Sequence, residues 1–107
     1  MTSRATANPE VVDNEAEHQY EIWKDGRRAG LAAYRLGRGE ITIVHTEIDD
    51  AFEGQGLGGQ LAKATLDDSR TRGLAVVPVC PFFAGYIKRH PEYLDLVPDS
   101  ERSRVAD

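Results

Sequence analysis

The segment Glu53-Gly54-Gln55-Gly56-Leu57-Gly58-Gly59 decides how this sequence is interpreted. Its glycines carry no side chain, so the backbone there can approach a phosphate group closely. A helical pattern begins at Leu57, and the first N–H groups of a helix have no partner within it, so this end of a helix attracts anions. The segment therefore predicts a loop that binds a diphosphate. The alternative is a loop whose glycines only turn the chain.

Two other nucleotide-binding motifs do not fit. Gly54, Gly56 and Gly59 match G-x-G-x-x-G, but that dinucleotide motif directly follows a first parallel strand and has an acidic residue about 20 positions later. Here a loop over residues 49–53 intervenes, three strands come first, and Val79-Cys80 stands where the acid belongs. No Gly-Lys-Ser/Thr follows the glycines, which excludes a P-loop.

The sequence before the loop predicts an antiparallel meander. Apolar and polar residues alternate in three stretches, the period of half-buried strands. These stretches span residues 18–23, 29–36 and 41–48. Asp25-Gly26 is a hairpin signal between the first two, and Gly37-Arg38-Gly39 makes the turn before the third.

After the loop, the pattern changes to helix, strand, helix. Residues 57–72 form a helical pattern with one narrow polar stripe. Residues 74–79 are a short apolar run rich in valine, typical of a buried strand, and the connection from Ile48 is long enough for a parallel crossover. Pro81 opens a second helix that ends before Pro91. The expected fold is α+β, with a mixed, mainly antiparallel sheet and two main helices.

Composition limits the class of protein. A chain of 107 residues is the size of one domain, and 40% hydrophobic with 29% charged residues is typical of a globular chain. The net charge of −5 argues against nucleic acid or an anionic membrane as the main partner. The single cysteine, Cys80, permits no internal disulfide, and no stretch approaches the ~20 apolar residues of a membrane span. We expect a cytoplasmic protein without a metal site.

Both ends of the chain are polar. Residues 1–15 contain no apolar run, so we expect a flexible arm there rather than a signal peptide. Residues 99–107 are expected to form a flexible tail. The folded domain is then expected over residues 16–98.

The glycine segment resembles the cofactor loop of the GNAT superfamily of N-acetyltransferases. These enzymes carry Arg/Gln-x-x-Gly-x-Gly/Ala between a strand and a helix, where it cradles the pyrophosphate of coenzyme A. Gly56 and Gly58 fall on the two small positions of that pattern. Glu53 departs from it, because the family has Arg or Gln there and a carboxylate repels a diphosphate.

Two further stretches resemble short, single-domain, YjdJ-like GNAT proteins. One is His45-Thr46-Glu47-Ile48 before the loop, and the other is the long run from Cys80-Pro81 to Tyr93. The resemblance covers residues 18–97 and implies a minimal GNAT-like acyltransferase domain. The chain lacks the helical segment that these enzymes usually place between their first two strands.

The resemblance implies a site for acetyl-CoA. The loop backbone would hold the pyrophosphate, and the splayed strands ending at Ile48 and Val79 would admit the pantetheine arm. The Ile48 N–H would polarise the thioester carbonyl, as an oxyanion hole does. The implied cofactor-binding residues are Ile48, Gln55, Gly56, Leu57, Gly58, Gly59 and Cys80.

Three residues are candidates for catalysis. Cys80 starts a helix, a position that lowers the pKa of a thiol. It either carries the acyl group, lines the cofactor, or is an inert core cysteine. His45 is a candidate base, alone or paired with Cys80, unless it is a half-buried histidine on the face of Ile41 and Ile43. Glu47, on the strand that lines the acyl group in the family, is a second candidate base.

The second helix also carries a tyrosine. Many GNAT enzymes use one there as the acid for the leaving thiolate, but alignment from Cys80 puts that position on Ile87. Tyr86 is therefore expected to pack. Lys88-Arg89-His90 is a charge cluster typical of a helix C-terminus.

These observations lead to three hypotheses of function. The first is an N-acyltransferase that moves an acyl group, expected to be acetyl, from acetyl-CoA to an amine of a small molecule or protein. The second is a non-catalytic acyl-CoA-binding or regulatory module. The third is an interaction domain without a ligand.

Overall fold

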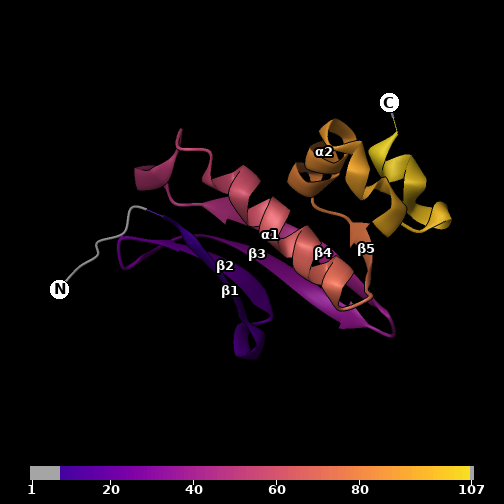
Figure 1. The fold of residues 1–107 in the computed structure, drawn as a ribbon, viewed down its shortest axis with the longest axis horizontal. Helices are drawn as coiled ribbons and strands as arrows, with labels where there is room; N and C mark the ends of the chain where they lie inside the picture. The colour runs from indigo at the N-terminus through magenta and orange to yellow at the C-terminus, as the bar shows by residue number, and fades with distance from the viewer. Residues whose placement is uncertain (1–7, 107) are drawn as a thin grey trace.

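Alternating burial along the strands defines two different faces of one sheet. In the computed structural model, which describes residues 8–106, two α-helices cover one of these faces (Figure 1). The strands are β1 (Glu10–Asn14), β2 (Gln19–Lys24), β3 (Arg27–Gly37), β4 (Glu40–Ile48) and β5 (Ala75–Pro78). The helices are α1 (Leu57–Thr71) and α2 (Pro81–Arg89), with short 3₁₀ turns at Glu15–Glu17, Asp50–Phe52, Pro91–Leu96 and Asp99–Val105.

The strands lie in the order β1-β2-β3-β4-β5. Neighbours from β1 to β4 are antiparallel, whereas β5 is parallel to β4 because α1 crosses over between them. Asp25 and Gly26 both have positive φ, 52° and 77°, as the predicted two-residue hairpin requires. The predicted α+β class, with a mixed and mainly antiparallel sheet, is confirmed.

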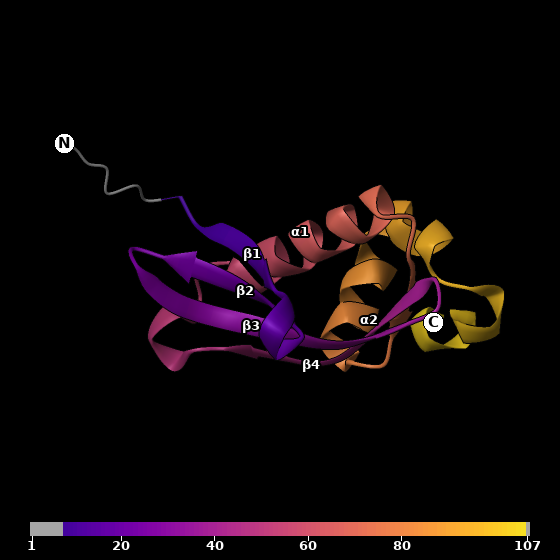
Figure 2. The ribbon, with the colours of Figure 1, turned by 90° about the horizontal axis from the view of Figure 1, so that it is seen from below.

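The core lies between the sheet and the helices. Tyr20 and Ile22 of β2, and Ile41 and Ile43 of β4, point to this side and are almost completely buried. From α1, Leu57, Leu61, Ala62 and Leu66 fill the space above them. No α-helix of residues 8–106 covers the opposite face, on which the short 3₁₀ turn Glu15–Glu17 lies (Figure 2). Nor is any helix in this part of the chain long and apolar enough to cross a membrane.

The two ends of the domain differ from the prediction. Residues 10–14, expected in the flexible arm, form the edge strand β1, and Val11 packs against the core. Residues 99–105, expected in the flexible tail, form a 3₁₀ turn that buries Val105. Strand β1 pairs with β2, Asp13 adds contacts to Tyr34 and Arg72, and the last turn packs against α2. Local periodicity does not reveal such tertiary contacts. The expected arm also includes residues 1–7, which lie outside the described residues, as does residue 107.

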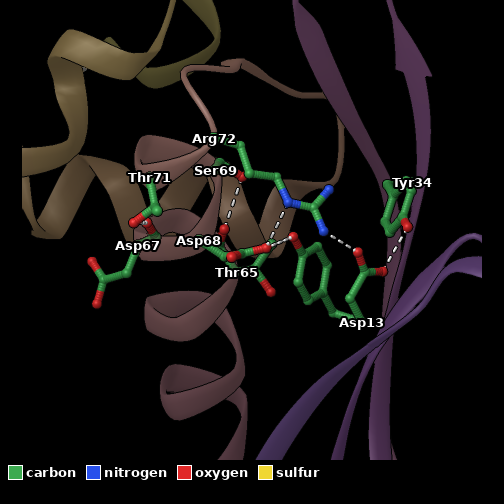
Figure 3. Close-up of polar contacts among 9 residues, drawn as sticks. Asp13, Tyr34, Thr65, Asp67, Asp68, Ser69, Thr71 and Arg72 are labelled. Carbon is green, nitrogen blue, oxygen red and sulfur yellow. Dashed lines mark hydrogen bonds and ion pairs between the residues drawn. The ribbon is translucent and has the colours of Figure 1, made fainter.

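A polar cluster joins β1 to the end of α1 (Figure 3). Asp13 accepts hydrogen bonds from the Tyr34 hydroxyl at 2.6 Å and from the Arg72 guanidinium at 2.5 Å. Arg72 Nε also lies 3.1 Å from Asp68, which accepts a hydrogen bond from the Tyr20 hydroxyl. Strand β1 is therefore tied to the helix layer as well as to β2.

Candidate functional site

The glycine loop adopts a backbone that depends on its glycines. Gly54 and Gly56 have φ of 83° and 75°, in the left-handed region that other residues rarely adopt. Gly56 is the N-cap of α1, where no side chain caps the helix and the first turn holds no acidic residue. The first N–H groups of an α-helix have no partner within the helix, and an anion can accept hydrogen bonds from them.

A cavity of about 440 Å³ opens beside the loop. Its lining includes Ile48 from the end of β4, the loop and first turn of α1, and an aromatic ring from α2. The lining residues are Ile48, Phe52, Glu53, Gly54, Gly56, Leu57, Gly58, Gly59 and Phe82. A Cβ atom on Gly58 would stand 2.8 Å from Phe82 Cζ, so the absence of a side chain keeps this groove open.

Five of the seven predicted cofactor-binding residues line this cavity; Gln55 and Cys80 do not. Gln55 instead accepts a hydrogen bond from Lys24 Nζ at 2.6 Å. Cys80 is buried, with 4% of the residue exposed. The predicted glycines therefore line the cavity, whereas Gln55 and Cys80 are not part of its lining.

Strands β4 and β5 stop pairing before β4 ends. Their register runs from Glu40 opposite Ala75 to Ile43 opposite Pro78, and a last hydrogen bond joins Cys80 N–H to Ile43 O at 2.9 Å. The chain then turns into α2, while β4 continues to Ile48. The backbone of β4 from Val44 to Ile48 consequently has no strand partner on the β5 side.

The Ile48 N–H points into this gap. Successive N–H groups of an extended strand point to opposite sides. Asp49 N–H donates to Ala29 O on the β3 side at 2.7 Å, so the N–H of the preceding residue points the other way. A backbone donor of a residue that lines the cavity therefore lies on the side of β4 that has no strand partner.

A bulge in β4 reverses the expected orientation of His45. On β3, the adjacent residues Ala33 and Tyr34 pair with His45 and Ile43, so Val44 is an extra residue without an opposite partner. Beyond Val44 the alternation is inverted. The expectation that His45 shares the face of Ile43 is therefore wrong, and His45 lies exposed on the open face of the sheet.

The predicted pair of His45 and Cys80 is also wrong. Thr46, not His45, faces Cys80, and its Oγ1 lies 3.2 Å from the sulfur. Neighbouring residues of a strand point to opposite faces, so His45 and Glu47 share the open face instead. Their side chains lie 2.7 Å apart, from His45 Nε2 to Glu47 Oε2, and both are more than half exposed.

Comparison with known proteins identifies the family of this chain. Residues 19–96 match the family model described as GCN5-related N-acetyl-transferase. The chain belongs to this GCN5-related N-acetyltransferase family. The prediction of a GNAT superfamily member is thereby confirmed.

Similar proteins support this assignment. The chain is 34% identical to Protein NATD1 of Xenopus tropicalis over 89 residues, 79% of this chain and 82% of the relative. It is also 34% identical to Protein NATD1 of Mus musculus over 89 residues, 79% and 81% of the two chains. The solution structure of a GCN5-like protein from Staphylococcus aureus superimposes with a TM-score of 0.66, at 26% identity, covering 87% of this chain and 91% of that one.

The tyrosine of α2 in this GCN5-related chain packs between the helices. Tyr86 is 8% exposed and stacks on His90 with ring centroids 4.1 Å apart, and burial raises the pKa of its hydroxyl. Ile87, the position that aligns with the family's tyrosine, is completely buried in the core. The geometry agrees with the expected packing role of Tyr86.

Three residues near the cavity of this GCN5-related chain were not among the predicted site residues. Phe82 forms one wall, while Lys24 and Arg27 reach the loop from the β2–β3 hairpin. The predicted meander already indicated that Lys24 and Arg27 lie near the loop. Strands β2 and β4 run in the same direction, so the turn after β2 lies at the same end of the sheet as the loop after β4.

Proposed function

We propose that this chain transfers an acyl group, most simply acetyl, from acetyl-CoA to an amine. The observation that carries the proposal is the position of the glycine-lined cavity. It adjoins Ile48, beside the gap where β4 and β5 no longer pair. A nucleotide thioester held by the loop would thus have its acyl end beside an unpaired backbone donor.

The residues of the cavity fit coenzyme A. The first turn of α1 offers N–H groups to the pyrophosphate, and Gly58 leaves room for the ligand below Phe82. Acetyl-CoA would supply a thioester whose carbonyl oxygen can accept a hydrogen bond from the Ile48 N–H. That donor would stabilise the negative charge that develops on this oxygen during transfer.

In the direct mechanism, the amine nitrogen attacks the thioester carbon from the open face. The C–S bond breaks, the thiolate of coenzyme A leaves, and the amine loses a proton to a base. Glu47 and His45 are the candidate bases, because both lie exposed on that face. Holding the amine and the thioester on either side of the gap would contribute much of the rate.

A second route passes through Cys80. Its sulfur would attack the thioester carbon first, the C–S bond to coenzyme A would break, and the Cys80 thiol proton would pass to the leaving thiolate. The amine would then attack the acyl-cysteine, the C–S bond to Cys80 would break, and the proton lost by the amine would restore the Cys80 thiol. The sulfur is close to Thr46 on the helix side of β4, next to the gap. This route would not need His45 as the partner of Cys80.

A non-catalytic acyl-CoA-binding module is the alternative. One observation favours it: His45 and Glu47 bond to each other and lie on a face that no α-helix of residues 8–106 covers (Figure 2). Such a face would suit a partner protein as well as a reacting amine. Binding of acetyl-CoA without turnover on any amine would support this alternative.

Intact-protein mass spectrometry and thermal unfolding with acetyl-CoA test the proposal. Stabilisation together with an acetyl adduct lost in Cys80→Ala would indicate the two-step route. Stabilisation without an adduct, with release of free thiol on addition of primary amines, would indicate direct transfer; Glu47→Gln and His45→Gln should then slow that release. If acetyl-CoA neither stabilises nor modifies the protein, the proposed function is wrong.

A further inference from the structure

The glycine loop has the wrong charge for its expected ligand. Residues 49–59 contain three carboxylates, Asp49, Asp50 and Glu53, and no basic side chain. Glu53 is itself part of the cavity lining. A diphosphate would add two negative charges here, and the partial charge of a helix terminus offsets only part of them. Counter-charge for such a ligand has to come from another part of the chain.

The β2–β3 hairpin brings two cations to the loop. Lys24 Nζ donates to Gln55 Oε1 at 2.6 Å, and Gln55 lies between the cavity glycines Gly54 and Gly56. The Arg27 guanidinium carbon lies 5.1 Å from the centroid of the Phe52 ring, which is another lining residue. Figure 1 shows the hairpin and the loop at the same end of the molecule.

In neither of these contacts does the cation pair with a carboxylate. Lys24 bonds to a neutral amide, and Arg27 stacks on a ring, an arrangement that leaves its N–H groups able to donate outward. Both side chains extend from a tight turn, Asp25-Gly26, whose geometry fixes where they start. The hairpin thus presents two positive charges at the edge of a cavity whose own loop is acidic.

We propose that Lys24 and Arg27 bind the diphosphate of the coenzyme A substrate and offset the charge of Glu53. Gln55 holds Lys24 beside the loop, and Phe52 holds Arg27. This inference rests on the proposed function, because it assumes that coenzyme A occupies the cavity. The hairpin then supplies the positive charges of the site, and the loop backbone supplies uncharged N–H donors.

Calorimetric titration of the full chain with coenzyme A, dephospho-coenzyme A and pantetheine tests the inference. The variants are Lys24→Met, Arg27→Met and both together, since methionine keeps much of the apolar stem of each side chain. The matched control is Arg38→Met, which removes the same charge from the exposed turn at the other end of the sheet. Thermal unfolding without ligand checks that each variant folds.

Each substitution at Lys24 or Arg27 should weaken coenzyme A binding by about tenfold, the loss of one charge-assisted hydrogen bond. Dephospho-coenzyme A should lose as much, because it keeps the diphosphate, whereas pantetheine, which has no phosphate, should be unaffected. Glu53→Gln should tighten coenzyme A binding by about threefold, because it removes a partly screened negative charge that repels the diphosphate.

Three results would overturn the inference while leaving the proposed function intact. They are unchanged coenzyme A binding relative to Arg38→Met, an equal loss of pantetheine binding, and full retention of dephospho-coenzyme A binding. The last would assign the cations to the 3′-phosphate instead. Absence of coenzyme A binding by the unaltered chain is a different result, because it would remove the proposed function as well.

Discussion

Replacing Asp13 with alanine should destabilise the whole domain. Asp13 lies on β1, its side chain is 11% exposed, and it accepts hydrogen bonds from Tyr34 and Arg72 (Figure 3). The Tyr34 hydroxyl belongs to a residue that is only 3% exposed. Burial, followed by the hydrogen bond to Asp13, raises the pKa of that hydroxyl, so it stays protonated and needs an acceptor.

The magnitude follows from the two groups that would lose their partner. An orphaned, buried Tyr34 hydroxyl costs about 1–3 kcal/mol. Arg72 is one-third exposed and keeps Asp68, so its loss is closer to 1 kcal/mol. Together these predict about 2–4 kcal/mol, and a fall in melting temperature of roughly 10–25 °C for a domain of this size.

Urea and thermal unfolding of Asp13→Ala measure this loss directly. Glu10→Ala is the control, since it removes an exposed carboxylate from the same strand. In a double-mutant cycle, Tyr34→Phe should recover part of the loss, because no orphaned hydroxyl then remains. Equal stability of Asp13→Ala and Glu10→Ala would refute the reasoning and would show that β1 contributes little to the fold.

Three more predictions concern stability. Burial raises the pKa of the Glu21 carboxyl, but four donors more than compensate and hold it below its ordinary value. Its stabilisation is therefore present above about pH 4.3 and lost as the pH falls further, so Glu21→Gln should cost about 1–3 kcal/mol in urea unfolding at pH 7 and much less at pH 3. Gly30→Ala should cost about 2–3 kcal/mol, because its Cβ would stand 2.6 Å from the Glu47 carbonyl oxygen; an unchanged urea midpoint would contradict this. Gly58→Ala should change stability by less than about 1 kcal/mol, since better helix propensity offsets a contact with the movable end of Phe82, and a larger loss would mean that this ring is fixed.

Local signals predicted most of the secondary structure. Asp25-Gly26 has the backbone that its residue types favour, and the strands on either side of it follow the period-two pattern. The glycine loop lies between a strand and α1, as the sequence indicated, because positive φ and a helix start are properties of a few neighbouring residues. The same reasoning located the buried strand that became β5.

The candidate site was predicted only in part. The extra residue Val44 turned His45 and Glu47 to the open face, and no feature of the local pattern announces a bulge. Nor did the pattern show that Thr46 rather than His45 would contact Cys80. A single added residue moves every later side chain of a strand to the opposite face. The bulge at Val44 therefore separates His45 from Cys80.

The sequence by itself determined the meander, the crossover helix and the glycine loop before that helix, because these depend on periodicity and turn chemistry within short stretches. Only the tertiary structure decided which face His45 occupies, that β1 belongs to the sheet, and that Lys24 and Arg27 lie at the acidic loop. The first two depend on how neighbouring strands pair, and the third depends on side-chain contacts between the β2–β3 hairpin and the loop that follows β4. Register between strands is set by the packing of the whole domain, and local residue types do not encode it alone.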